Sequence, residues 1–494
     1  MASTVENSIR SVVGAGITQL AKINRRRLAE PAGGHPFLTG IHRPMDGELT
    51  IEDLRVDGAI PPELTGRYLR NGPNPALPPN PASYHWFAGA GMVHGLAIAG
   101  GKALWYRNRW VRGAEACAAL GQPLPPGARN GRNDAPNTNI VGIAGRTWAI
   151  VEAGGHPVEL SHELETIAHN KFDGTLANSY TAHPHWCPAT GERHAICYRA
   201  EVMDKVWHTV MDAQGRIIRE EPIAVEHGPS IHDCAITPDH VLIFDLPVTF
   251  SMKKLIAGLS FPYQWNPAHR ARVGVLGRNA PAESIIWCDV EPCYVFHPAN
   301  AFVGADGRII VDVVAHDRMF ARSNYGPDSE TSHFERWTID TAARRVDRAT
   351  IHPAPQEFPR YDERRTGQPY RYAITVGVAG TDDATMNIAD SRLYRHDLTA
   401  GHTETRDFGA DCAPGEFVFV PRTADSADAG AYDGAAETDG WYIGLVINIA
   451  ADTTDLVILN ANDFTGPPQA TIHLPHRIPP GFHGNWVAQS AGLL

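Results

Sequence analysis

The chain has 494 residues, 43% of them hydrophobic, which is enough to bury a large core and excludes a disordered protein. The net charge of −12 and the isoelectric point near 6.0 leave no basic field, so we expect no nucleic-acid partner. The seven cysteines are odd in number and form no CxxC pair, which argues against a disulfide framework or zinc ribbon and fits a reducing cytoplasm. No apolar run approaches the roughly 20 residues of a spanning helix, and no secretory signal is recognised, so we expect a soluble or peripheral protein.

Residues 3–24 are predicted to form an amphipathic helix. Ser3 or Thr4 can cap it, and an arginine triplet, 25–27, follows it. The apolar residues on one helical face are Val5, Ile9, Val12, Val13, Ile17, Leu20 and Ile23. Two interpretations stay open: an arm that lies on a membrane surface or partner, and a helix that packs on the body of the protein. We predict that residues 1–35 form this N-terminal arm.

From about residue 50 the sequence changes to short strands separated by turns rich in glycine and proline. Strands are predicted at 103–111, 147–152, 206–210, 216–220 and 241–246, and hairpins at 302–314, 334–346, 393–408 and 456–474. Such hairpins recur without strict sequence identity, and no linker divides the chain. This pattern favours a β-propeller over a sandwich. We therefore predict an all-β fold in which residues 36–494 form a single β-propeller domain.

Four segments present a histidine at a turn or at the start of a strand. They contain His183, His232, His297 and His483, separated by 49, 65 and 186 residues. A lone histidine of this kind is more often structural than a ligand. In a propeller, however, the start of each blade's inner strand points at the central axis, so distant residues can meet there. Four neutral imidazoles with open coordination positions suit Fe(II) and oxygen chemistry better than structural zinc.

Three glutamates lie in apolar, strand-like surroundings: Glu152, Glu357 and Glu416. Each alone could be a strand-edge acid that reaches water, since a buried glutamate is costly unless it is paired. Metal-bound histidines usually donate their second N–H to a carboxylate, a carbonyl or water. Three such acids beside four candidate ligands therefore favour a role behind the histidines.

Several segments together resemble the carotenoid cleavage oxygenase family, in order, from about residue 40 onward. They are 71–75 (NGPNP), 85–94 (HWFAGAGMVH), the four histidine segments, 357–360 (EFPR) and 415–421 (GEFVFVP). The resemblance implies a seven-bladed β-propeller with a loop and helix cap over a non-haem iron on the axis, bound by the four histidines. It also implies that Glu152, Glu357 and Glu416 support His232, His297 and His483 respectively, which leaves His183 without a carboxylate. One departure is that Ala88 and Ala90 stand where the family usually has acidic residues, so the local turn is expected to differ.

The resemblance implies an Fe(II) dioxygenase that splits a conjugated C=C bond of an apolar alkene with dioxygen into two carbonyl products. A carotenoid or apocarotenoid is the expected substrate, and a stilbene or alkenylphenol of the vinylguaiacol or isoeugenol type is the alternative. Family members that act on stilbenes carry a lysine just before the first glutamate, where this chain has Val151. The predicted lining of the substrate tunnel is Trp86, Phe87, Trp148 and Val151. The absence of GxSxG, Rossmann and P-loop patterns agrees with this chemistry.

Segment 248–265 combines Lys253 and Lys254 with several aromatic residues. It is interpreted as a surface that dips into a bilayer, as a cap helix packed on the propeller, or as both. A cytoplasmic location, with peripheral contact to the inner membrane left open, is expected, and the sequence makes no prediction of the oligomeric state. Two other functions stay open: a non-catalytic propeller that binds proteins, and an isomerohydrolase with the same metal site.

Overall fold

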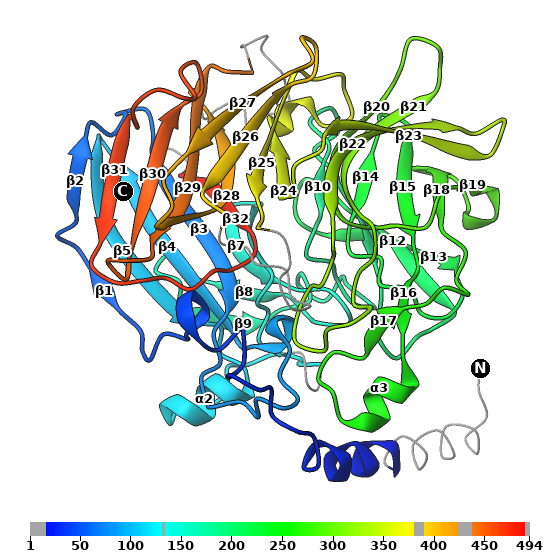
Figure 1. Cartoon of the computed structure of the whole chain (residues 1–494), viewed down its shortest axis with the longest axis horizontal. Helices are drawn as coiled ribbons and strands as arrows, with labels where there is room; N and C mark the ends of the chain where they lie inside the picture. Colours follow the sequence, from blue (N-terminus) through cyan, green and yellow to red (C-terminus); the bar gives the residue numbers. More distant parts are fainter. Residues whose placement is uncertain (1–15, 131–133, 380–389, 423–436, 490–494) are drawn as a thin grey trace.

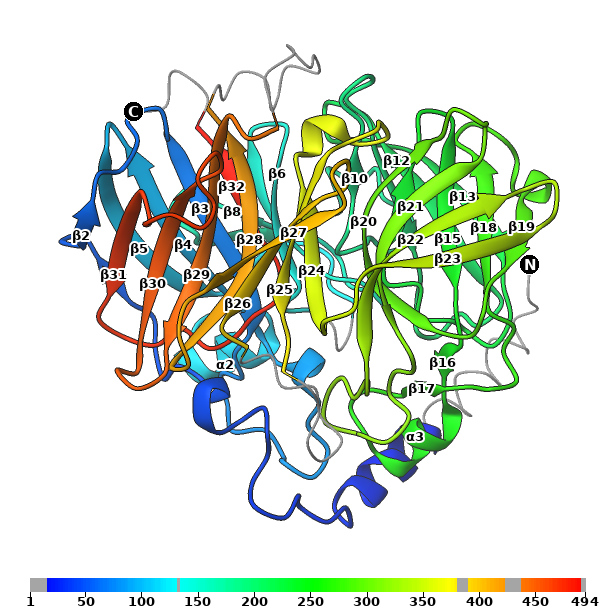
Figure 2. The same ribbon diagram turned by 45° about the horizontal axis from the view of Figure 1, so that its top comes forward.

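The computed structural model describes residues 16–130, 134–379, 390–422 and 437–489, and every structural statement below concerns these residues. The fold is all-β and propeller-like: the sheets stand side by side around the molecule, and most of the short helices gather at one end (Figures 1 and 2). The prediction of an all-β fold of the propeller type is confirmed.

Most sheets are antiparallel and contain four or five strands. One has the order β1 (Thr50–Ile51), β5 (Lys102–Trp110), β4 (Gly91–Ala99), β3 (Gly66–Pro73) and β32 (Gly484–Ala488). The next two are β6 (Asn139–Ile143), β7 (Arg146–Ile150), β8 (Val158–Leu160) and β9 (Thr166–His169), and β10 (His185–Trp186), β11 (Arg193–Cys197), β12 (Lys205–Met211) and β13 (Ile217–Ala224). Two more are β24 (Gln356–Tyr361), β25 (Tyr372–Gly377), β26 (Arg392–Asp397) and β27 (His402–Asp407), and β2 (Arg55–Gly58), β31 (Ala470–Leu474), β30 (Thr453–Asn460), β29 (Gly440–Asn448) and β28 (Cys412–Pro421).

One sheet has eight strands. Its order is β14 (Cys234–Ile236), β15 (His240–Asp245), β18 (Arg272–Gly277), β19 (Ile286–Asp289), β23 (Arg345–His352), β22 (Ser332–Asp340), β21 (Ile309–His316) and β20 (Tyr294–Val303). A single parallel pair, Asp289 with Arg345, joins β19 to β23, whereas the other neighbours are antiparallel. The described residues therefore form six sheets of four or more strands, whereas seven blades were expected. The number of blades stays a prediction.

One edge strand of each four- or five-stranded sheet, and both edge strands of the eight-stranded sheet, succeed one another around the centre of the molecule. Neighbouring contacts link β10 to β14, β14 to β20, β20 to β24, β24 to β28, β28 to β32 and β32 to β6. The first and last parts of the described chain meet where β3 pairs antiparallel with β32. The core lies between adjacent sheets, where apolar side chains of one sheet pack on those of the next, as Leu96 and Ile98 do with Ile443 and Leu456.

Short helices and one hairpin form a cap at one end of the sheets (Figures 1 and 2). They are η1 (Gly40–His42), η2 (Trp86–Ala88), α2 (Ala114–Leu120), and α3 (Met252–Ala257) between β16 (Val248–Phe250) and β17 (Tyr263–Trp265). Two further turns of helix, η3 (Ala282–Ser284) and η4 (Glu363–Arg365), lie in other connections. Within the described residues no helix is long and apolar enough to cross a membrane.

Residues 16–25 form the visible part of the predicted N-terminal helix, and 3–15 lie outside the described residues. The helix lies beside α3: Asn24 donates from Nδ2 to the Ile256 carbonyl at 2.8 Å, and Arg25 from Nε to the Gly258 carbonyl at 2.8 Å. Gly258 has a φ of 92°, and a Cβ there would lie 2.7 Å from the Ala21 carbonyl oxygen, so the close approach requires glycine. The described part of the helix thus packs on the body of the protein.

Candidate metal centre

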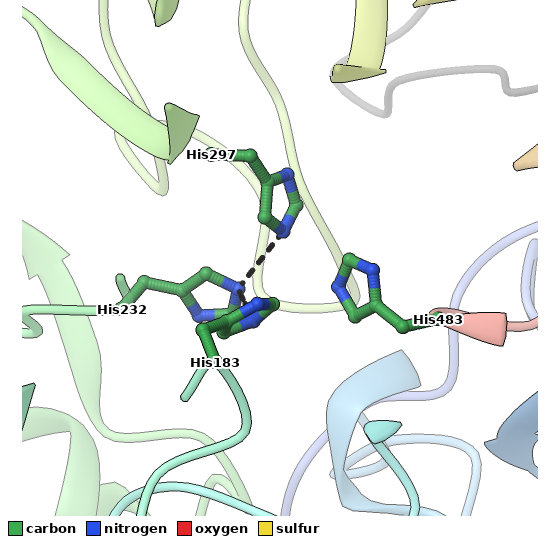
Figure 3. A group of neighbouring side chains, drawn as sticks. All are labelled: His183, His232, His297 and His483. Atoms are coloured by element: carbon green, nitrogen blue, oxygen red, sulfur yellow. Dashed lines mark hydrogen bonds between the residues drawn. The ribbon is translucent and has the colours of Figure 1, made fainter. Parts of the chain in front are cut away.

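Four histidines converge from the inner ends of four strands (Figure 3). His183 and His232 each lie two residues before a strand, β10 and β14, while His483 directly precedes β32 and His297 lies inside β20. Their ligand nitrogens all lie within 4.8 Å of one another, and the four side chains are only 4% to 9% exposed. Nε2 of His232 is 3.0 Å from Nε2 of His183 and 3.2 Å from Nε2 of His297. The Nε2 atoms therefore face one common point.

β-Bulges turn several of the site residues toward this point. The register shifts in β20 between Val295 and Pro298, in β24 between Glu357 and Arg360, and in β28 between Pro414 and Phe417. A bulge bends its strand and changes the direction of the side chain, which is a recurrent feature beside functional sites. These three shifts span or adjoin His297, Glu357 and Glu416, so the irregular pairing places them at the centre.

Phe358, next to Glu357, has a φ of 53°, a left-handed conformation that costs a non-glycine residue of order 1–3 kcal/mol. Its ring stacks on that of His297, with centroids 5.5 Å apart and planes 25° apart. The strained backbone therefore holds an aromatic wall against one of the four imidazoles.

Each of three histidines has a glutamate behind it. Nδ1 of His232 is 2.7 Å from Oε2 of Glu152, Nδ1 of His297 is 2.6 Å from Oε2 of Glu357, and Nδ1 of His483 is 3.0 Å from Oε1 of Glu416. The structure thus places each carboxylate on the histidine that the family resemblance assigns to it. With the proton held on Nδ1, each Nε2 lone pair is free to point toward the centre.

Two of the glutamates carry additional donors. Glu357 also accepts a hydrogen bond from Nε2 of His316 at 2.8 Å, and Oε2 of Glu416 accepts one from the Gly484 N–H at 2.8 Å. Burial raises the pKa of Glu357, but His297 and His316 outweigh it and hold the pKa well below the usual range. Burial likewise raises the pKa of Glu416, but Arg360 and His483 lower it to about 2. Both carboxyl groups are therefore ionised at neutral pH.

The fourth histidine has a different neighbour. Nδ1 of His183 lies 3.7 Å from Oδ2 of Asp233, and Oδ1 of Asp233 accepts from Nε2 of His185 at 2.7 Å and from the Cys234 N–H at 2.6 Å. Sequence reasoning missed Asp233, His185 and His316. The first two stand one and two residues from predicted ligands, which was a usable signal, whereas nothing local marks His316.

The donor set fits a divalent first-row metal ion. Burial, and then the other imidazoles, lower the pKa of His183 well below its usual value, which keeps this ring neutral and able to donate an electron pair. Four buried imidazole nitrogens around one point suit metals that prefer nitrogen ligands, and the carboxylates behind them supply the orienting contacts that such ligands normally have. The cluster can therefore hold a metal ion.

A cavity of about 730 Å³ ends at this cluster. It reaches His232, His297 and His483 and is bounded by the cap and by the inner ends of the sheets. Its lining includes three of the residues predicted for the tunnel, Trp86, Phe87 and Val151, and further large side chains: Tyr198, Phe250, Leu255, Phe261, Tyr263, Phe296, Phe358 and Phe482. A largely apolar, aromatic cavity beside a metal site is a natural place for an extended apolar ligand.

Comparison with known proteins agrees with this geometry. The family model described as retinal pigment epithelial membrane protein matches residues 42–488. A carotenoid cleavage oxygenase of Mycobacterium tuberculosis is 41% identical, over 92% of this chain and 97% of that protein. The chain belongs to the carotenoid cleavage oxygenase family. It is therefore an oxygenase.

Solved structures similar to this oxygenase share its fold. A lignostilbene dioxygenase of Pseudomonas brassicacearum is 26% identical with a TM-score of 0.81, covering 94% of this chain and all of that one (100%). A cobalt-substituted apocarotenoid oxygenase of Synechocystis is 27% identical with a TM-score of 0.78, covering 90% of this chain and 97% of that one. The likeness extends over nearly the whole of each chain.

Trp148 does not line the cavity of the oxygenase, contrary to the prediction. It lies in β7, is 2% exposed, and packs on Phe172 with ring centroids 4.7 Å apart, while the Arg146 guanidinium covers its ring. The reason is strand alternation: successive side chains of β7 point to opposite faces, and Trp148 faces the neighbouring sheet. Val151, beyond the end of the strand, faces the cavity instead.

We predict that Trp148→Ala destabilises the oxygenase without changing its catalysis. Removing a buried tryptophan leaves a void, which costs about 3–5 kcal/mol of unfolding free energy. Denaturant unfolding should show this loss, while turnover per folded, metal-loaded molecule stays at the wild-type value. Phe87→Ala, which changes a ring in the cavity lining, serves as the opposite control, with altered KM and a smaller loss of stability. A raised KM in Trp148→Ala at unchanged stability would contradict the core placement.

Proposed function

We propose that this oxygenase is a non-haem Fe(II) dioxygenase that cleaves a conjugated C=C bond of a carotenoid or apocarotenoid into two carbonyl products. His183, His232, His297 and His483 are the proposed iron ligands, and Glu152, Glu357 and Glu416 support three of them. The observation that carries the proposal is the convergence of four buried Nε2 atoms at the inner end of an aromatic cavity. Membership of the carotenoid cleavage oxygenase family supports it.

Iron is the proposed metal because the donor set is neutral and nitrogen-only. Four such ligands, the four histidines, would leave a bound divalent ion its full charge. When bound, ferrous iron supplies the dioxygen chemistry of the reaction, and the protein needs no organic cofactor. The cobalt-substituted form of the Synechocystis relative shows that cobalt is accommodated in that protein.

The protein's own groups have three tasks. The carboxylates hold Nδ1–H of their histidines and so fix the direction of each Nε2. The aromatic lining orients a flat polyene and excludes water. In this lining Phe296 contacts both Phe87 and His232, and Phe358 stacks on His297. Positioning one double bond beside the metal is then the main contribution of the chain, and no nucleophile or general base is required.

A carotenoid is favoured over the phenolic alternative by the composition of the cavity. Val151 places an apolar side chain where stilbene-cleaving members carry lysine, and no lysine is among the described residues that line the cavity. Arg25, a cationic residue in that lining, uses its Nε to bind the Gly258 carbonyl. An apolar wall matches a hydrocarbon chain better than a phenolate. The 41% identity to a protein named for carotenoid cleavage points the same way.

We also propose that the sheets form a seven-bladed ring and that residues 36–494 are one domain with 1–35 as an arm. Counting the eight-stranded sheet as two blades, divided at the single Asp289 and Arg345 pair, supports the number seven. Peripheral membrane contact is proposed at the side of the cap where helix 16–25 and α3 meet. The exposed Leu20, Ile23 and Met252 support it, because Met252 lines the cavity and Leu20 and Ile23 lie on the same helix as Arg25, which also lines it.

Anaerobic reconstitution with Fe(II), followed by assays under ¹⁸O₂, tests the proposal. We expect about one iron per chain, in line with a single buried ligand set, and labelled aldehyde or ketone fragments from β-apocarotenals or intact carotenoids. Resveratrol and 4-vinylguaiacol in the same panel are expected to be poor substrates. Absence of iron binding would favour a protein-binding propeller, unlabelled product would favour an isomerohydrolase, and turnover of the phenols alone would favour the alternative substrate class.

A further inference from the structure

His183 is the one histidine of the four without a glutamate, yet it does not lack an acidic neighbour. Oδ2 of Asp233 is 3.7 Å from its Nδ1, compared with 2.6 to 3.0 Å for the three glutamate contacts. Asp233 is 5% exposed, so its charge is nearly removed from water. At this separation the interaction is electrostatic rather than a direct hydrogen bond.

Asp233 is held rigidly. Both of its short hydrogen bonds reach Oδ1: one comes from the Cys234 N–H at 2.6 Å and one from Nε2 of His185 at 2.7 Å. Oδ2 is then the oxygen directed toward His183. Because Asp233 directly follows His232 and His185 closely follows His183, the two segments that supply the ligands also supply this pair. The arrangement links β10 and β14 at the centre of the molecule.

A second, more polar cavity borders His183 and Asp233. This cavity, of about 240 Å³, is lined by His183, His185, Asp233 and Arg360, whereas His183 is not in the lining of the large cavity. His183 and Asp233 therefore border the same space, which water can enter. A fixed carboxylate beside Nδ1 of His183 favours the tautomer with the proton on Nδ1 and leaves Nε2 for the metal.

We propose that Asp233, fixed by His185, is the positioning residue of His183 and completes a set of four carboxylates, one behind each histidine. This inference rests on one part of the proposed function, namely that the four histidines bind a metal ion. Asp233 acts through His183 and touches neither substrate nor the reacting atoms.

Asp233→Asn in the full-length protein tests this role, with Co(II) as a spectroscopic probe. The substitution keeps the size of the side chain and an oxygen for the Cys234 N–H, but removes the charge. We expect Co(II) release to a chelator to become about 10–100-fold faster, as for other residues that orient metal ligands, and the visible d–d bands of bound Co(II) to shift. His185→Gln, which keeps the carboxylate but loosens it, should give a smaller change in the same direction.

Asp245→Asn is the matched control. Asp245 is a fully buried aspartate whose Oδ1 accepts from Nε2 of His269 at 2.8 Å, and it lies outside the metal centre. It should lose stability but keep the wild-type Co(II) spectrum and release rate. If Asp233→Asn changes these two quantities no more than Asp245→Asn does, Asp233 has only a structural role. Failure of the wild-type protein to take up Co(II) would instead overturn the metal centre itself, and this inference with it.

Discussion

Replacing His297 by alanine is expected to abolish turnover through loss of iron. The change removes one of four nitrogen donors and leaves Glu357, which is 1% exposed, with only the Phe358 N–H as a partner on its Oε2. Metal affinity falls by about 10–100-fold when only an orienting contact is lost, so loss of a ligand should exceed that range. Iron content after anaerobic reconstitution and the rate of apocarotenal cleavage would both fall to background.

His269→Ala is the control for this prediction. His269 is also a buried histidine with a carboxylate partner, Asp245, at 2.8 Å, but it belongs to the connection before β18 and does not face the cluster. This variant should lose stability while keeping iron and turnover per folded molecule. Wild-type rates in His297→Ala would refute the assignment of this histidine as a ligand.

Glu357→Gln is expected to leave a folded protein with about 10–100-fold lower activity and faster iron release. The ionised carboxylate accepts from both His297 and His316, at 2.6 and 2.8 Å. A glutamine has one acceptor oxygen and carries no charge, so one of the two histidines loses its acceptor and the electron donation of His297 weakens. Stopped-flow measurement of iron transfer to a chelator, together with kcat, would show both effects.

Glu335→Gln provides the comparison. Glu335 is 4% exposed and accepts from the Trp337 indole N–H at 2.8 Å and from Arg348 at 2.8 Å, so it is a similarly buried glutamate in β22, outside the metal centre. Its loss should lower stability and leave iron release unchanged. Equal iron release in the two variants would mean that Glu357 does not act through His297.

Sequence reasoning singled out the four histidines and three glutamates that cluster in the structure, because they stand at recognisable places. Each histidine lies near the start of a strand or within an inner strand, and each glutamate is an acidic residue in apolar surroundings. The charge of the residues and the periodicity of the surrounding sequence therefore indicated them without any geometry. The same reasoning could not find His316. That residue reaches Glu357 because β21 lies against β24 in the fold, and no local pattern records which strands become neighbours.

Other differences have equally physical reasons. Trp148 was expected in the tunnel because aromatic residues occur both in cores and in cavities. Which of the two a residue of β7 faces depends on the direction of side-chain alternation along the strand, and Trp148 faces the core. The sequence of the N-terminal helix showed an apolar face, but it could not tell whether that face contacts a lipid surface or the rest of the protein. The hydrogen bonds of Asn24 and Arg25 show that residues 16–25 contact α3 and the glycine after it. The number of sheets depends on one residue pair, Asp289 with Arg345, because this pair joins β19 to β23 and so merges two four-stranded groups into one sheet. The two strands are far apart in the chain, so the sequence could not indicate the pair.

The pairing of β3 with β32 also dictates an order of events during synthesis. A nascent chain exposes His183, His232 and His297 well before His483, and the strand that follows His483 must pair with residues made more than four hundred positions earlier. Such a long-range contact forms late, because its chain entropy has to be overcome first. A complete four-nitrogen cage for a metal therefore exists only once the strand after His483 has been made and has paired with β3, and loading should depend on the metal available to the folded domain rather than to a partly made one.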